Sequence, residues 1–203
     1  MSAESAAALP SPPRKPRRRR APAWSELPAE SVRRYLEPGP VVLVGSAWRG
    51  RCDLMTMGWH TVMEFTPSLL GCVISRANHS HGLVRRGREC TINIPDARWV
   101  DEVVGVGNCS GAELDKFERF GFTAEPASQV AAPLVRECFV QIECRVADTR
   151  LVNRYDFFVL EVLRARVDTS VRRPQTLHYQ GDGEFMLSGR TISRRALFQP
   201  HML

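Results

Sequence analysis

The sequence lacks the features that mark several classes of protein. It has no run of about 18 apolar residues, the length that a membrane-spanning helix needs, and its six cysteines show no CxxC or CxxH spacing. Disulfide scaffolds are short and dense in cysteine, so we expect reduced thiols, a cytoplasmic protein and no membrane partner. The motifs GxxxxGK[ST] and GxSxG are also absent, as is a GxGxxG that opens a βαβ unit.

Acidic residues are scarce at the N-terminus. Residues 1–20 hold six basic residues against Glu4 alone, and the other 183 residues carry only about +1 of the net charge of +6. The prolines of this segment argue against an amphipathic transit helix. We expect residues 1–23 to form a disordered basic tail, and residues 24–203 to form one domain. The tail serves as a spacer or as a weak contact for nucleic acid or another polyanion, and composition leaves both open.

Runs of β-type sequence make up most of the remaining chain. Polar and apolar residues alternate, or apolar residues dominate, in segments of strand length. The segments are 40–48, 53–65, 67–75, 89–95, 134–152, 153–168 and a strand–turn–strand at 176–190. Gly50 marks a hairpin between the first two, and Cys138 and Cys144 fall on one apolar face. These runs predict a mainly β or α+β protein built on an antiparallel barrel.

Short helices are expected between the strands. Ser25 is a candidate cap for a helix in 24–36, Asp96 for one in 96–107, and Ser80 for one in 81–87. Ser110 with Glu113 makes a capping-box pattern ahead of a helix that reaches Phe120.

Three stretches contain residues that could do chemistry. His79 and His81 lie two apart, but no other histidine or cysteine has a matching metal-ligand spacing. Ser75, Arg76 and Ser80 combine hydroxyls, a guanidinium and a helix N-terminus, which suits a phosphate or carboxylate; the alternative is a capped helix beside a solvated arginine. Segment 56–65 places Thr56 and His60 in an apolar strand, where they line a planar polar ligand or simply share one side of the strand.

Several stretches together resemble the flavin reductase-like family, the FMN-binding split-barrel proteins that include flavoredoxin. They occur in the family's order and cover about residues 38–189. The matching pieces are "PGPVVLVGSAWRGRCDLMTMGWHTVMEFTPSLLGCVIS", "HSHGLVRRGRECTINIPD", "GNCSGAELDKFERFGFT", "APLVRECFVQIECRV" and "LHYQGDGEFMLSG".

The resemblance implies a split β-barrel, an antiparallel Greek-key barrel with short helical insertions, that forms a homodimer and binds FMN near the interface. The flavin ring would lie against strand 54–61, and the phosphate or ribityl end would lie near the 75–80 stretch. The residues implied for the cofactor site are Asp53, Thr56, Trp59, His60, Thr61, Ser75, Arg76, Ser80, Lys116, Tyr155 and Phe185. No side chain need act as an acid or a base, because the chemistry belongs to the cofactor.

The chain departs from the family pattern at three positions. Asp53 stands where the family often has Asn. Near "NRYDFF", Arg154 or Tyr155 stands where the family often has His, and Leu160 stands where it often has Gly before "EV". We therefore expect an NAD(P)H-dependent flavin reductase, or an FMN electron carrier for a partner oxygenase or another acceptor. The alternatives are a flavin- or haem-binding split barrel without turnover and a polyanion-binding protein that acts through the tail.

Overall fold

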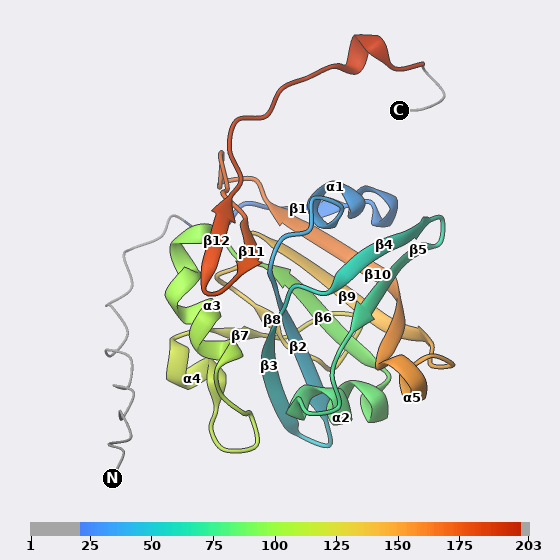
Figure 1. The fold of residues 1–203 in the computed structure, drawn as a ribbon, viewed down its shortest axis with the longest axis vertical. Helices are drawn as coiled ribbons and strands as arrows, with labels where there is room; N and C mark the ends of the chain where they lie inside the picture. The colour runs from blue at the N-terminus through green and yellow to red at the C-terminus, as the bar shows by residue number, and fades with distance from the viewer. Residues whose placement is uncertain (1–20, 200–203) are drawn as a thin grey trace.

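The computed structural model describes residues 21–199, and an antiparallel sheet dominates this part of the chain (Figure 1). Residues 1–20 of the expected tail lie outside the described residues. The strands are β1 (Trp24–Leu27), β2 (Val42–Trp48), β3 (Arg51–Met57), β4 (His60–Phe65), β5 (Ser68–Val73), β6 (Glu89–Ile94), β7 (Ala124–Glu125), β8 (Leu134–Val135), β9 (Val140–Asp148), β10 (Phe157–Asp168), β11 (Leu177–Gly181) and β12 (Glu184–Leu187). The helices are α1 (Arg33–Leu36), α2 (His79–Gly87), α3 (Val100–Gly107), α4 (Lys116–Phe120) and α5 (Val152–Tyr155), with 3-10 turns η1 (Ala29–Ser31), η2 (Ala97–Trp99) and η3 (Arg195–Leu197). No helix among the described residues has the length and apolarity that crossing a membrane requires.

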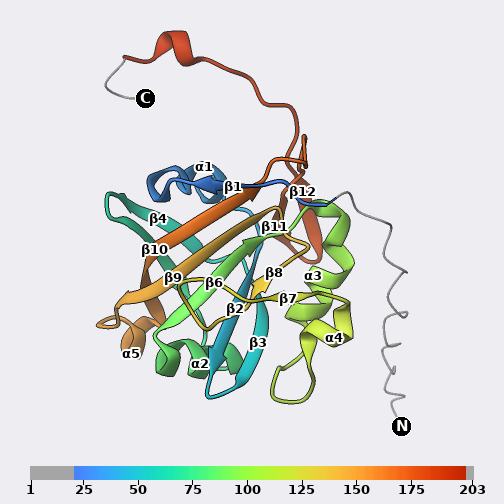
Figure 2. The same ribbon diagram turned by 180° about the vertical axis from the view of Figure 1, so that it is seen from behind.

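The main sheet is rolled around a single apolar core. Its strand order is β3-β2-β6-β9-β10-β5-β4, with β1 paired to β10, and every pairing is antiparallel. Met57 on β3 and Val62 on β4 belong to the same core cluster, although their strands stand at opposite ends of this order. The two ends of the sheet must therefore curl toward each other, as expected for a split barrel (Figures 1 and 2).

Several local expectations are confirmed. Arg49 and Gly50 both have positive φ, which gives a tight two-residue turn between β2 and β3. The carboxylate of Asp96 accepts a hydrogen bond from the backbone N–H of Arg98, so it caps the η2 turn that leads into α3. Cys138 and Cys144 are both fully buried, but the expectation that they share one face is wrong. Cys144 lies in β9 and faces the barrel core, whereas Cys138 precedes β9 and packs in a second cluster with Leu43 and Leu54.

The expected helix in 24–36 is wrong in its first half. Trp24 pairs with Asp168 across β1 and β10, and the guanidinium of Arg166 lies 4.4 Å from the Trp24 ring. Ser25 therefore caps nothing, because its backbone is extended in a strand. Local propensity missed this strand because its stabilising partner lies about 140 residues further along the chain.

Segment 53–65 is two strands rather than one. The strands separate at Gly58 and Trp59, where β3 ends and the chain crosses to β4 at the other end of the sheet order. One unbroken strand cannot occupy both ends of a rolled sheet. The expected Ser110 cap is also wrong: Asp115 caps α4 by accepting from the N–H groups of Phe117 and Glu118 at 2.8 and 3.1 Å.

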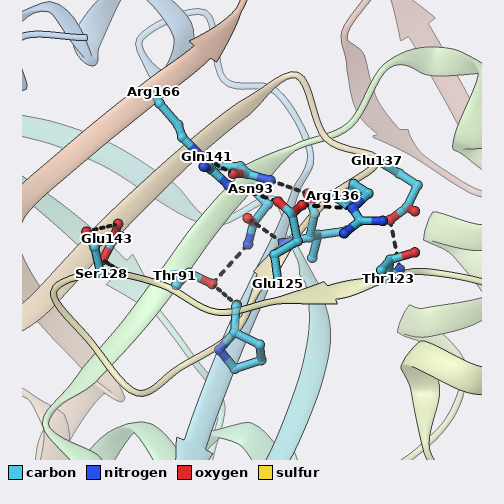
Figure 3. Close-up of polar contacts among 12 residues, drawn as sticks. Thr91, Asn93, Thr123, Glu125, Ser128, Arg136, Glu137, Gln141, Glu143 and Arg166 are labelled. Atoms are coloured by element: carbon cyan, nitrogen blue, oxygen red, sulfur yellow. Dashed lines mark hydrogen bonds and ion pairs between the residues drawn. The ribbon is translucent and has the colours of Figure 1, made fainter. Parts of the chain in front are cut away.

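The segment from 123 to 138 crosses the outer face of β6 and β9 and covers it (Figures 2 and 3). Buried side chains on these strands bind its backbone: Asn93 Oδ1 accepts from Val135 N–H at 3.0 Å, and Gln141 donates to Val135 O at 2.6 Å. The carboxylate of Glu143, 3% exposed, accepts from both the N–H and the hydroxyl of Ser128. The outer side of β6 and β9 is therefore closed by the chain's own strap.

Candidate functional site

A buried polar cluster joins three of the expected site residues. Asp53 on β3 accepts a hydrogen bond from the hydroxyl of Ser80 on α2 at 2.6 Å, and Lys116 Nζ on α4 lies 3.7 Å from Asp53 Oδ1. Lys116 also donates to the carbonyl of Val106 at 3.1 Å, and only about 5% of it is exposed. Neither charge faces open solvent, so each compensates the other. The cluster fastens α2 and α4 to the barrel wall.

The loop before α4 packs closely on the same carboxylate. A Cβ added at Gly111 would lie 2.0 Å from Asp53 Oδ1, so only glycine fits here without movement. Asp53, which sequence comparison marked as a departure, thus positions the 108–115 loop as well as Lys116.

Ser80 does not cap α2. The N-cap is Asn78, which makes no side-chain capping hydrogen bond, while Ser80 lies in the first turn with its hydroxyl turned to Asp53. The first-turn N–H groups of this nine-residue helix therefore have no side-chain acceptor at the cap. Such an end favours an anion, because the helix dipole and free N–H groups point at it.

Arg76 stands in the exposed connection between β5 and α2. Its Nε donates to Asp156 Oδ1 at 3.1 Å and one Nη donates to the carbonyl of Asn153 at 3.0 Å. Hydrogen bonds from the Arg76 side chain and backbone hold the pKa of the Asp156 carboxyl below its ordinary value. The guanidinium is thus oriented but still exposed, with 64% of the side chain accessible.

Asp156 is a site residue that the sequence analysis missed. It has a φ of 54°, a conformation that Asp tolerates better than most residues, and it follows the short helix α5. Asp156 Oδ1 also lies 3.6 Å from Nε2 of the buried His81. Burial is the main reason that the pKa of His81 is lowered, and the Asp156 charge opposes it. No local signal pointed to it, because segment 153–168 was expected to be one strand and the helical turn α5 was not expected.

Trp59, His60 and Thr61 form the opposite end of the site. The Trp59 carbonyl accepts from Val73 N–H at 3.0 Å, which places this segment beside the strand that leads to Ser75. The Trp59 side chain is 75% exposed. His60 Nε2 lies 2.7 Å from the Pro40 carbonyl, and its buried Nδ1 has no partner within the described residues. Burial lowers the pKa of His60, so the ring is neutral at pH 7.

The remaining expected residues lie apart from this line. The hydroxyl of Thr56 donates to the Val103 carbonyl at 2.6 Å, so α3 covers it. Tyr155 is 55% exposed on α5, next to Asp156 and thus near Arg76. Phe185 lies on β12, whose hairpin both views place at the other end of the barrel from α2 (Figures 1 and 2).

The site residues form a line rather than a compact catalytic group. It runs from Trp59 and His60, past Val73 and Ser75, to Arg76 and the N-terminus of α2. One end offers an exposed aromatic ring and backbone groups, and the other offers cationic and N–H donors, a combination that fits a flat ligand with an anionic tail. Within the described part of the chain, no group of three His, Cys, Asp or Glu side chains could hold a metal ion.

Comparisons with known proteins agree with this fold. The sequence model described as "Flavin reductase like domain" matches residues 33–185. The Escherichia coli (strain K12) protein YddH is 29% identical over 174 residues, 79% of this chain and 92% of YddH. The FMN reductase (NADH) RutF of Bradyrhizobium diazoefficiens is 28% identical over 119 residues, 59% of this chain and 62% of RutF. A solved FMN-binding domain of a flavin reductase-like enzyme from Shewanella baltica OS155 has a TM-score of 0.80 and 22% identity, covering 85% of this chain and 97% of its own.

Proposed function

The chain belongs to the family of flavin reductase like domains, and from this premise we propose that it binds FMN and acts as an NAD(P)H:flavin oxidoreductase or as an FMN electron carrier. The observation that carries the proposal is the line of site residues from Trp59 to Arg76 and the N-terminus of α2. Support also comes from RutF, which is named as an FMN reductase (NADH), and from the FMN-binding Shewanella domain.

Each end of the line has a separate task in binding. Arg76 and the uncapped N–H groups of α2 bind the phosphate, and Asp156 keeps the guanidinium oriented toward it. Trp59 and the backbone of the 59–61 segment support the ring. FMN held in this way would supply the redox chemistry, and the residues of the chain would bind and orient it. Neutral His60 borders the ring end without adding charge to it.

A second candidate function rests on Asp53. Because its carboxylate is paired with Lys116, this lysine brings no free positive charge to a bound flavin. A lysine without free charge favours a module that binds flavin or haem without turnover, whereas an unpaired lysine would favour the enzyme. A protein that is yellow when purified, yet does not oxidise NADH or NADPH with added FMN, supports the module over the enzyme.

A homodimer is part of the same proposal, and the uncovered side of the barrel supports it. Helices α3 and α4 cover β3, and the 123–138 strap covers β6 and β9. In the described chain no comparable element lies across the outer face of β5 and β10, and α1 covers only part of the neighbouring β4 (Figures 1 and 2). Along these strands, residues that point into the core alternate with apolar residues that point outward onto this face and are partly exposed. They are Met63, Leu69, Val73, Phe157, Val159 and Leu163. A second copy would bury this face beside the candidate flavin site.

The test compares FMN with riboflavin, which lacks the phosphate. FMN and riboflavin are titrated against the purified protein by flavin fluorescence, and NADH and NADPH oxidation is then followed with bound FMN. Arg76→Ala is expected to raise the FMN dissociation constant at least tenfold, about 1.4 kcal/mol, and to change riboflavin binding less than twofold.

The matched control is Arg86→Ala, which removes the same charge near the other end of α2 and is expected to leave both affinities unchanged. Equal weakening of FMN and riboflavin by Arg76→Ala contradicts the phosphate role of Arg76. A protein that binds no FMN at micromolar concentration contradicts the proposed function.

A further inference from the structure

Residues 189–199 form an arm that packs on no other part of the described chain. After β12 ends at Leu187, the chain extends away from the barrel in both views, and residues 189–199 are all exposed (Figures 1 and 2). The arm still has local order, since Arg195–Leu197 form the η3 turn. Three of its large apolar side chains face solvent: Ile192 at 59%, Leu197 at 79% and Phe198 at 55% exposure. Clustered exposed apolar residues of this kind mark a contact surface.

A groove of suitable character lies between α1 and β4. Its volume is about 360 Å³, and its lining includes Leu36, Glu37, Gly39 and the whole of segment 60–65. Met63 and Phe65 form its apolar floor, and these residues are 47% and 49% exposed. Glu37 and Glu64 contribute negative charge, although Arg33 pairs with Glu37 at 3.3 Å.

The arm and the groove complement each other in apolar character and in charge. Leu197 and Phe198 match the apolar floor, while Arg194 and Arg195 match the carboxylate of Glu64. This carboxylate accepts a hydrogen bond from the backbone N–H of Phe65 and has no ion-pair partner among the described residues. The eleven residues from Ser188 to Phe198 span up to about 35 Å when extended, enough to cross onto a neighbouring molecule. In both views the arm points away from its own barrel, so a second copy is the better source of the groove.

We propose that the C-terminal arm of each copy lies in the α1–β4 groove of a second copy, with Leu197 and Phe198 on its apolar floor and Arg194 and Arg195 beside Glu64. This inference rests on the homodimer of the proposed function. Met63 lines the groove and also lies on the uncovered face of β4, β5 and β10, so the two contacts are continuous. Because His60 and Thr61 line the groove as well, the arm places residues of one copy against the ring end of the other copy's flavin site.

Disulfide trapping tests which chain supplies the arm. In a background with the exposed Cys52 and the half-exposed Cys109 changed to Ser, one differently tagged chain carries Leu197→Cys and the other carries Met63→Cys. Mixed under mild oxidation, the two chains are expected to form a disulfide-linked heterodimer. Leu187→Cys, exposed at the base of the arm, replaces Leu197→Cys as the control and is expected not to cross-link. Absence of the cross-link overturns the proposal. A single chain that carries both cysteines is tested as well, and a disulfide that forms only within one chain also overturns it.

Charge reversal tests the complementarity. Arg195→Glu and Glu64→Arg are each expected to raise the dimer dissociation constant at least tenfold in sedimentation, and their combination is expected to restore it. Arg173→Glu, an exposed arginine outside the arm, controls for net charge. Unchanged dimerisation in the single variants overturns the proposal. FMN titration of the parent protein reports separately on the flavin site. A dimer that binds FMN but forms no cross-link refutes the arm alone, whereas a monomer that binds FMN refutes the arm and the homodimer but leaves flavin binding standing.

Discussion

At the scale of single residues, Asp53 does most to organise the candidate site. Its carboxylate accepts from Ser80, lies beside Lys116 and contacts the backbone at Gly111, so one side chain joins β3, α2, α4 and the 108–115 loop. The sequence showed only that an acid stood where the family often has an amide. The structure supplies the reason that it is tolerated, namely a buried cation within 4 Å.

Gly111→Ala is expected to lower the free energy of unfolding by about 1–3 kcal/mol, because the new methyl group would press on a carboxylate that Ser80 and Lys116 hold in place. Urea denaturation followed by circular dichroism measures the loss. Gly58→Ala is the control, since a Cβ there meets nothing within 4 Å and is expected to change stability by less than about 0.5 kcal/mol. Equal stability of the two variants would contradict the tight packing at Gly111.

The two buried histidines predict a loss of stability in mild acid. Burial lowers the pKa of both His60 and His81 in the folded protein, whereas the unfolded chain takes up these protons near its ordinary pKa of about 6.5. The unfolded state therefore binds more protons as the pH falls below about 6.5, and stability falls with it. Groups facing His81 are Asp156, Arg76 and Arg85; the Pro40 carbonyl faces His60. The urea midpoint of the parent protein is expected to fall between pH 8 and 5.5, and this fall is expected to be smaller in the double variant His60→Gln/His81→Gln. A variant whose midpoint falls as steeply as that of the parent would contradict this account.

At the scale of elements, the 123–138 strap has little secondary structure of its own. Its strands β7 and β8 are two residues each, so its position depends on side chains from the barrel rather than on a ladder. Asn93, Gln141 and Glu143 are buried and bind strap backbone or side chains (Figure 3). Polar residues at outward positions of alternating strands suggested a solvated face, but the strap makes that face internal.

Glu143→Ala is expected to destabilise the fold by about 2 kcal/mol, because it leaves the N–H groups of Ser128 and Gln129 without their acceptor, while Arg164 keeps its ion pair with Glu26. Glu161→Ala is the matched control: it breaks a more exposed ion pair with Arg145 and is expected to cost about 0–1 kcal/mol. Chemical denaturation of both variants measures the difference. Limited proteolysis within 123–138 should also be faster in Glu143→Ala, and a strap that stays protected would count against this role.

At the scale of the whole molecule, one side of the barrel remains apolar and uncovered. The inward residues of β5 and β10 build the core, and the outward side chains near the start of β10, Phe157 and Val159, are also apolar, as in a strand buried on both faces. Further along β10 the outward side chains include the charged Glu161, Arg164 and Arg166. The expected dimer would explain this pattern, because the second face then becomes internal in the pair.

Val159→Lys is expected to raise the dimer dissociation constant more than tenfold, because a charge would be buried without a partner. Val104→Lys is the control, since Val104 is 38% exposed on α3, on a different side of the barrel. Sedimentation velocity at several concentrations measures both variants. If both dissociate alike, the contact does not involve the β4–β5–β10 face.

The sequence by itself determined the class of fold and most of its strands. Alternation of polar and apolar residues reflects the two faces of a strand, and the tight turn at Gly50 reflects local backbone freedom; both are properties of neighbouring residues. The stretches that resemble the family located the expected site, including Trp59, Arg76 and Lys116. Only the tertiary structure decided that 24–27 is a strand, that 53–65 is two, and that Ser80 bonds Asp53 instead of capping α2. It alone brought Asp156 to Arg76, 80 residues apart, because such contacts depend on long-range pairing that no local pattern encodes.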